Sequence, residues 1–320
     1  MNGQAARLEI VRPAIPVDLD GAVLAESWSN DTWLTGGSVL RVCWRGDRKR
    51  LLREAMLLES LPASVPHATV LTAGCTQGLT WMVARRVPGE RLDLVWPRLS
   101  AQERHDAVIA RAGALKALHG WDPPFEVSGE LRQAGLAPPA VPDDIVGAGI
   151  VPLPIARLYP LLRWLEDQPG MDGDLASRVR ERVEDLRPLV SEAEFEDGVV
   201  VHGDAHPANV LWHQGRLAAL LDLEWARLGP TDLEFATILA DDPGTQPREL
   251  SSAAPASEIP VLGSLRAGYP ELFEREHLTE RAWLYDICFR VRQLYLCKAL
   301  DPDWVQDLAS LAAHPRVRFD

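Results

Sequence analysis

Two acidic side chains and one carboxamide stand at short spacings in the second half of the chain. Asp204 and Asn209 lie five positions apart. Pro207 between them prevents a regular helix, so we expect a tight loop that directs both side chains into one cleft. Asp222 follows the apolar run Leu217–Leu221, which is typical of a strand. The spacing therefore predicts that three oxygen-bearing side chains meet where a loop and a strand end.

These residue types suit the transfer of a phosphoryl group. Carboxylate and carboxamide oxygens are the ligands that Mg²⁺ prefers, so Asn209 and Asp222 are candidate magnesium ligands. Asp204 is the candidate that orients or deprotonates an attacking hydroxyl. If the chain stays extended from Asp222 to Glu224, the two carboxylates face the same side. Each acid alone could instead cap a helix or end a strand, but the three together indicate phosphoryl transfer.

The composition limits the partners. The formal net charge is −13, from 46 acidic and 33 basic side chains, which argues against nucleic acid or an anionic membrane as a partner. The charge suits a cationic substrate, although acidity also serves solubility. The first twenty residues lack an apolar signal segment, and the charge-free stretches are too polar to span a membrane, so we expect a cytoplasmic protein. Four scattered cysteines without metal-site spacing predict core thiols: Cys43, Cys75, Cys288 and Cys297.

The first third of the chain has the pattern of a small sheet with one helix. Gly36-Gly37 predicts a hairpin turn. Leucine and alanine recur at three- and four-residue intervals within Arg50–Leu61, which predicts a helix. Four runs rich in β-branched and aromatic residues predict strands: Ala22–Trp28, Thr32–Thr35, Val39–Trp44 and Leu79–Val87.

Helices dominate the remainder. Ser100 and Glu103 form a capping-box pattern that opens a helix through about His119. The Pro- and Gly-rich stretch Gly120–Pro154 predicts a long irregular excursion, of the kind that serves as a lid or binding loop. Further helices are expected at Ile155–Asp167, Asp174–Val190 and Thr279–Leu300, and short strands at Val199–Val201, Val210–Trp212 and Leu217–Leu221.

The run from His202 to Asn209 (His-Gly-Asp-Ala-His-Pro-Ala-Asn), with Asp222-Leu-Glu224, resembles the catalytic and metal motifs of the aminoglycoside phosphotransferase and choline kinase family. Members of that family are relatives of the protein kinases. The resemblance implies an α+β, bilobal, protein-kinase-like fold. Residues 1–87 would form a nucleotide-binding lobe of mainly antiparallel sheet. Residues 88–320 would form a larger, mainly helical lobe for catalysis and acceptor binding.

The resemblance also implies roles in the catalytic loop. Asp204 would be the catalytic base, Asn209 and Asp222 the Mg²⁺ ligands, and Glu224 a neighbour of the metal or the substrate. His202 and His206 would be structural. The segment Gly229–Leu233 resembles the turn whose aspartate, here Asp232, braces that loop; a capping box formed by Thr231 and Glu234 explains the same residues equally well.

In the first lobe, Arg41 resembles the phosphate-binding cation, and Glu54 its helical partner. Protein kinases use lysine there, whereas choline kinases resemble this chain in using arginine, which grips phosphate through two donors. An exposed arginine and a solvated glutamate are the alternative. Two further sets of nucleotide-binding residues are expected: Ser29 and Asn30 in place of a glycine-rich loop, and the backbone of Arg85 and Val87 at the purine edge.

These expectations define a small-molecule kinase that uses ATP or GTP with Mg²⁺. The acceptor hydroxyl would belong first to an aminoglycoside-like or other hydroxylated cationic antibiotic, and the reaction would inactivate the drug. The alternatives are a metabolite kinase for choline, an amino alcohol or a sugar, and a non-catalytic pseudokinase. Trp225 and Asp241 are acceptor-binding candidates beside Asp204 and Glu224. Core packing of Trp225 and a solvated loop at Asp241 are the competing interpretations.

Overall fold

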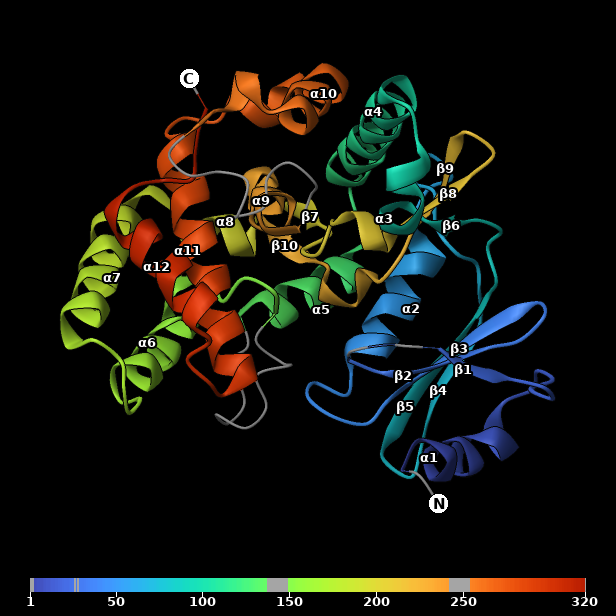
Figure 1. The fold of residues 1–320 in the computed structure, drawn as a ribbon. Helices are drawn as coiled ribbons and strands as arrows, with labels where there is room; N and C mark the ends of the chain where they lie inside the picture. Colours follow the sequence, from blue (N-terminus) through green and yellow to red (C-terminus); the bar gives the residue numbers. More distant parts are fainter. Residues whose placement is uncertain (1–2, 26, 28, 137–148, 242–253, 320) are drawn as a thin grey trace.

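The computed structural model describes residues 3–25, 27, 29–136, 149–241 and 254–319. A sheet with one helix on either side lies at the lower right of Figure 1, and helices fill the left and the top. The protein-kinase-like α+β fold expected from the sequence is therefore confirmed.

The first lobe is a five-stranded antiparallel sheet in the order β1-β2-β3-β5-β4. Helix α1 (Gly3–Val11) packs on one face, against Leu40 and Val42. Because side chains alternate along a strand, Arg41 between them points to the other face, where α2 (Arg50–Ser60) lies. The strands are β1 (Val23–Ala25), β2 (Asp31–Leu34), β3 (Ser38–Cys43), β4 (Val70–Thr76) and β5 (Leu79–Arg85).

The second lobe contains helices and three small sheets, β6-β8-β9, β7-β10 and β11-β12. Its helices are α3 (Leu92–Val95), α4 (Ala101–His119), α5 (Phe125–Leu136), α6 (Tyr159–Glu166), α7 (Gly173–Leu186), α8 (Ala193–Glu196), α9 (Phe235–Asp241), α10 (Pro260–Gly268), α11 (Leu278–Cys297) and α12 (Pro302–Ala313). Its strands are β6 (Glu90–Arg91), β7 (Val199–Val201), β8 (Val210–His213), β9 (Arg216–Leu220), β10 (Arg227–Gly229), β11 (Ala254–Pro255) and β12 (Val317–Arg318).

One apolar cluster joins the two lobes. Ala55 and Leu58 of α2 belong to the same buried cluster as Leu118 of α4 and Val127 and Leu131 of α5. In Figure 1, α5 lies beside α2, between the sheet and the remaining helices. Helix α2 is therefore packed against the helical lobe as well as against its own sheet.

Most predicted elements are present, and the capping box of α4 is complete: Ser100 accepts from the Glu103 backbone, and Glu103 accepts from the Ser100 backbone. The prediction of an irregular Gly120–Pro154 is wrong for Phe125–Leu136, which is α5. Val127 and Leu131 there are one helical turn apart and buried. Residues 137–148 of the excursion lie outside the described residues. Helix α1 and the edge strand β4 were not predicted.

Two simple properties complete the description. Cys43 and Cys288 are buried thiols, as expected, whereas Cys75 and Cys297 are exposed, and all four are free. In the part of the chain that the structure describes, no helix is both long and apolar enough to cross a membrane.

Candidate active site

The catalytic loop connects β7 to β8 and requires glycine at its start. Gly203 has φ +76°, and a Cβ at this position would lie 2.6 Å from the carbonyl oxygen of Trp225. Any other residue would be strained and would displace Trp225. The loop and the segment around Trp225 are thus in direct contact.

Asp204 is held on both carboxylate oxygens. Nδ2 of Asn209 donates to Asp204 Oδ2 over 3.0 Å and to the Asp204 backbone carbonyl over 2.9 Å. Nε2 of His206 lies 3.5 Å from Oδ1. Nδ1 of His206 accepts from the backbone N–H of Ala208, so Nε2 is the ring nitrogen that faces Asp204. His206 therefore helps to shape the loop and also faces the acid.

Two buried groups fix the loop from behind. His202 is fully buried, and its Nε2 bonds the carbonyl of Leu221 at 2.9 Å, immediately before Asp222. Glu234, also fully buried, accepts from the backbone N–H groups of His202 (2.5 Å) and Gly203 (3.3 Å). Burial lowers the pKa of His202, against the attraction of Glu234 and Asp204. A neutral His202 is consistent with this structural position.

The brace expected of Asp232 is made by Glu234 instead. Asp232 bonds Arg281 and the hydroxyl of Tyr285 on α11. The alternative capping box is not formed either, because Pro230 occupies the N-cap and no side chain caps the turn. In the 3₁₀ turn Thr231–Glu234, the carboxylate of the last residue, Glu234, points toward the catalytic loop, whereas that of the second residue, Asp232, does not.

Asn209 and Asp222 are brought together by backbone pairing. The N–H of Leu221 donates to the carbonyl of Asn209 at 2.8 Å. The prediction of an extended Asp222-Leu223-Glu224 is wrong: Asp222 has the left-handed conformation (φ 61°, ψ 48°), and a 3₁₀ turn, Leu223–Trp225, follows.

This donor set fits a magnesium ion. Because Nδ2 of Asn209 is committed to Asp204, its Oδ1 is the amide atom turned away from the loop. Asp222 adds a partly exposed carboxylate. It directly follows Leu221, whose N–H is bonded to the carbonyl of Asn209. Both are hard oxygen ligands at the ends of the paired strands β8 and β9, and a site of this kind leaves room for water and phosphate oxygens.

Arg41 gathers three carboxylates in the same region. Its Nη1 bonds Glu54 at 2.5 Å, and its Nη2 bonds Asp222 and lies 3.0 Å from Glu224. Oxygen atoms of these three acids lie within 4.8 Å of one another. Glu54 also accepts from the backbone N–H of Leu223 at 3.1 Å. The structure thus pairs Arg41 with Glu54, and it links both to the acidic motif.

Ser29 and Asn30 are turned toward Glu224. The Ser29 hydroxyl donates to Glu224 Oε1 at 2.6 Å, and Nδ2 of Asn30 donates to Oε2 at 2.7 Å. The side chain of Glu224 has no exposed surface. Glu224 is therefore engaged with the first lobe and does not face an acceptor.

The remaining predicted residues are placed as follows. Arg85 ends β5, and its N–H donates to the carbonyl of Thr69 at 2.8 Å, so this N–H is already bonded within the protein. Val87 lies on the connection to β6. Trp225 is half-buried against the catalytic loop. Asp241 is the last residue of α9, and its side chain is outside the described part of the structure.

Three residues near the site were not predicted: Arg50, Glu234 and Arg292. Guanidinium carbons of Arg50 and Arg292 lie 5.7 and 6.0 Å from the centre of the Trp225 ring. Arg292 is 3% exposed, and its Nε has no hydrogen-bond partner among the residues that the structure describes. Its position between the apolar residues Val291 and Leu294 of α11 is a signal in the sequence, whereas Arg50 resembles an ordinary surface residue one turn before Glu54.

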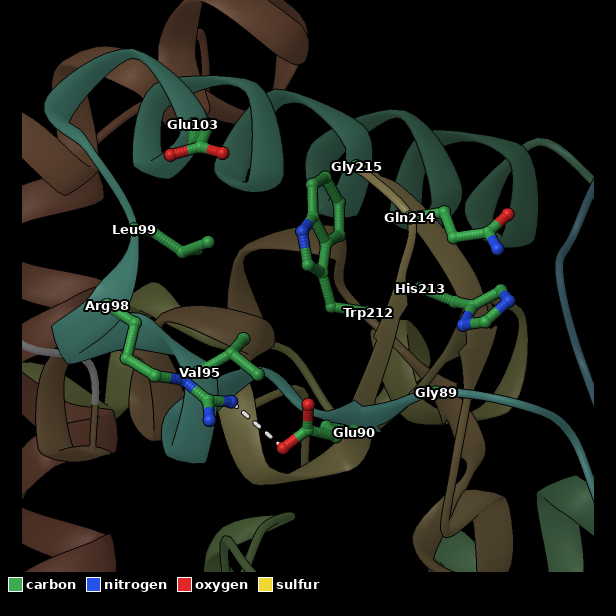
Figure 2. A pocket seen from close by; sticks show the side chains of 10 residues that line it. All are labelled: Gly89, Glu90, Val95, Arg98, Leu99, Glu103, Trp212, His213, Gln214 and Gly215. Atoms are coloured by element: carbon green, nitrogen blue, oxygen red, sulfur yellow. Dashed lines mark hydrogen bonds and ion pairs between the residues drawn. The ribbon is translucent and has the colours of Figure 1, made fainter.

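A surface pocket of about 440 Å³ lies away from this chemistry. Figure 2 shows it between α4, the α3 segment and the β8-β9 hairpin, with Trp212 standing toward α4. The ion pair Glu90–Arg98 (2.9 Å) lies at its edge. None of its lining residues belongs to the acidic motifs, and the candidate active site remains the group formed by Asp204, Asn209 and Asp222.

Comparisons with known proteins identify the family and the fold. The model of the phosphotransferase enzyme family matches residues 20–267. A comparison with curated proteins gave no match. Among solved structures, aminoglycoside phosphotransferase APH(2'')-IIa in complex with gentamicin has a TM-score of 0.64 at 16% identity, covering 99% of this chain and 98% of that chain.

Two further structures are similar over nearly their full length. ADP-bound APH(2'')-Ib has a TM-score of 0.62 at 17% identity, covering 99% of this chain and 98% of that chain. A thermostable mutant of APH(4)-Ia, in a ternary complex with AMP-PNP and hygromycin B, has a TM-score of 0.62 at 18% identity and covers 98% of both chains. At these identities the likeness concerns the fold.

Proposed function

The chain belongs to the phosphotransferase enzyme family and is a small-molecule kinase, and we propose that it moves the γ-phosphoryl group of ATP or GTP to a hydroxyl of its acceptor. The observation that carries this proposal is the convergence of Asp204, Asn209 and Asp222 on one cleft, with the Arg41–Glu54 pair beside them. Residues 1–87 would bind the nucleotide, and residues 88–320 would bind the acceptor.

Asp204 is the proposed proton acceptor. The acceptor oxygen attacks the γ-phosphorus, the bond from that phosphorus to the β,γ-bridging oxygen breaks, and the hydroxyl proton passes to Asp204. Hydrogen bonds from Asn209 and the facing ring of His206 keep the carboxylate in one orientation. His202 and Glu234 hold the loop that carries it.

Nucleotide binding is assigned to groups from both lobes. Arg41 has donors directed at the acidic motif, where the phosphates would lie, and arginine is suited to phosphate oxygens. Asn209 and Asp222 would hold Mg²⁺, which, when bound, neutralises charge on the transferring group. The backbone of Arg85 and Val87 would meet the purine. A cytoplasmic location follows from the need for nucleoside triphosphate.

For the acceptor, we favour a hydroxylated cationic antibiotic. The net charge of −13 attracts cations. The solved complexes of similar fold contain gentamicin and hygromycin B. Phosphorylation would add about −1.5 to −2 charges to such a drug and oppose its binding to an anionic target.

One observation favours the second candidate, a metabolite kinase. The guanidinium of Arg292 is buried on the acceptor side, near Trp225, and it interacts electrostatically with Asp204. A buried arginine beside the base suits an acceptor with several oxygen atoms, such as a sugar, better than a polycation.

Growth inhibition tests the choice. A drug-sensitive bacterium would express either the chain or its Asp204→Ala variant and be exposed to a panel of hydroxylated antibiotics. We expect resistance to one drug class, lost in the variant. If neither soluble protein protects, the antibiotic proposal fails, and nucleotide consumption with sugars and amino alcohols tests the second candidate.

A further inference from the structure

The carboxylate of Glu224 is surrounded by donors from the first lobe. Besides Ser29 and Asn30, it receives Nε of Arg50 at 3.0 Å and lies 3.0 Å from Nη2 of Arg41. Three of these donors meet Oε2, and the Ser29 hydroxyl meets Oε1. Because the side chain also has no exposed surface, a metal ion or an acceptor could reach Glu224 only if the side chains around it moved.

Arg50 joins Glu224 to two other segments. This side chain is 1% exposed. Its Nη2 donates to the carbonyl of Ser29 (2.8 Å) and to Oδ1 of Asn30 (2.9 Å), and its Nη1 donates to the carbonyl of Arg45 (2.7 Å). One guanidinium therefore ties the turn before α2, the segment around Asn30 and the acidic motif together.

By the resemblance to protein kinases, the segment that carries Ser29 and Asn30 would correspond to the loop that covers the phosphates. The hydroxyl of Ser27 bonds the carbonyl of Asn30, which closes a turn. Of the described residues in this turn, Ser29 and Asn30 have their side chains bonded to Glu224, so these two residues can offer a phosphate only their backbone N–H groups. The position of those N–H groups depends on the hydrogen bonds that Ser29 and Asn30 make with Glu224 and Arg50.

We propose that Glu224, Arg50 and Asn30 are positioning residues that fix the phosphate-covering turn and Arg41 relative to Asp222, and that Glu224 is not a metal or acceptor ligand. This inference rests on the proposed function, because it assumes that the cleft binds a nucleoside triphosphate. A turn anchored in this way replaces the flexibility of a glycine-rich loop with a buried ion-pair network. Loss of this network would weaken nucleotide binding even when no acceptor is present.

The test measures binding of AMP-PNP or GMP-PNP by the purified chain by titration calorimetry over a range of Mg²⁺ concentrations. We expect Glu224→Gln to raise the Kd at saturating Mg²⁺ about tenfold, and Asn30→Ala about threefold, because each removes charge-assisted hydrogen bonds from the anchor. The Mg²⁺ concentration for half-maximal binding should stay unchanged. The double variant should lose less than the product of the two single effects, since both residues act in one network.

Glu166→Gln is the matched control, because Glu166 is also paired with an arginine, Arg180 at 2.5 Å, but on the exposed surface of the helical lobe. Its Kd should equal that of the wild type. If Glu224→Gln does not fold, as judged by circular dichroism, Asn30→Ala and Ser29→Ala carry the test.

Three outcomes have distinct meanings. Unchanged Kd values in the folded variants would overturn the inference while leaving the proposed function intact. A higher Mg²⁺ requirement in Glu224→Gln would also overturn it, because it would make Glu224 a metal ligand. Absence of binding of either nucleotide by the wild type would overturn the proposed function itself.

Discussion

Asp204 is buried and Asp222 is partly exposed, and their surroundings shift their pKa values in opposite directions. Burial alone would raise the pKa of Asp204, yet His206, His202 and Arg292 together hold it below its usual value. Burial raises the pKa of Asp222 to about 6, and the charges of Glu224 and Asp204 add to this effect against Arg41. The first acid therefore stays ionised to receive a proton, and the second lies where a cation would relieve a surplus of negative charge.

Removing the charge of Asp204 separates chemistry from binding. Asp204→Asn keeps an oxygen that can accept from Asn209, so the loop should remain folded. We expect the transfer rate to fall about 10²- to 10⁴-fold, while the Kd for Mg·AMP-PNP stays within about twofold. Transfer assays and calorimetry measure the two quantities. A variant that transfers at the wild-type rate would show that another group takes the proton.

Asp222→Ala should have the opposite effect. Loss of a carboxylate ligand is expected to weaken nucleotide binding in the presence of Mg²⁺ by about tenfold or more. Without metal, the affinity should be unchanged or higher, because Arg41 loses a competing anion and keeps Glu54. Calorimetry with Mg²⁺ and with a chelator distinguishes the two conditions; equal losses in both would place the metal elsewhere.

Local spacing was sufficient to predict some of the site, but not all of it. Asp204 and Asn209 share one short loop, and Asp222 follows the strand that pairs beside them, so their meeting needs few tertiary contacts. The choice of Glu234 over Asp232 depends on the phase of a 3₁₀ turn, and that phase is set by packing against α11 rather than by local sequence.

At the scale of elements, α2 is clamped between the sheet and α5. Leu58 of α2 and Leu131 of α5 belong to one buried cluster, and Glu54 on the same helix meets Arg41. The sequence did not indicate this contact, because Gly129 and Gly135 lower the helix propensity of α5 and its buried stripe is narrow. The helix that carries Glu54 is therefore held in place by the helical lobe.

Leu131→Ala tests this coupling. The truncation should cost about 2–5 kcal/mol of stability, because Leu131 is 2% exposed. It should also weaken Mg·AMP-PNP binding severalfold, since α2 loses part of its support. Leu308→Ala is the control: Leu308 of α12 is fully buried in a different cluster, so it should lose similar stability without the change in affinity. Denaturant titration and calorimetry provide both values, and equal affinities in the two variants would contradict the coupling.

At the scale of the whole molecule, one fold is retained at low identity. The match to aminoglycoside phosphotransferases covers nearly the full chain at 16–18% identity. A fold is preserved by burial patterns and a few motif residues, both of which are visible in the sequence. Acceptor choice depends on side chains that come from distant elements, such as Arg292 of α11 beside Trp225. The local sequence around either residue does not indicate that the two are in contact.

The overall charge provides a test that distinguishes a cationic acceptor from an uncharged sugar. With 46 acidic and 33 basic side chains, the molecule attracts a cationic acceptor by a field that salt screens, with a Debye length of about 10 Å at 0.1 M and about 3 Å at 1 M. For a cationic antibiotic, we expect KM to rise severalfold as NaCl is increased over that range, with kcat nearly constant. For a sugar held by Arg292, KM should hardly change, because the acceptor carries no charge. Steady-state kinetics at a fixed saturating nucleotide concentration measure this slope. A flat profile for a cationic drug would mean that the acidic surface does not guide it, and the short-range contacts at Trp225 and Arg292 would then have to determine acceptor choice.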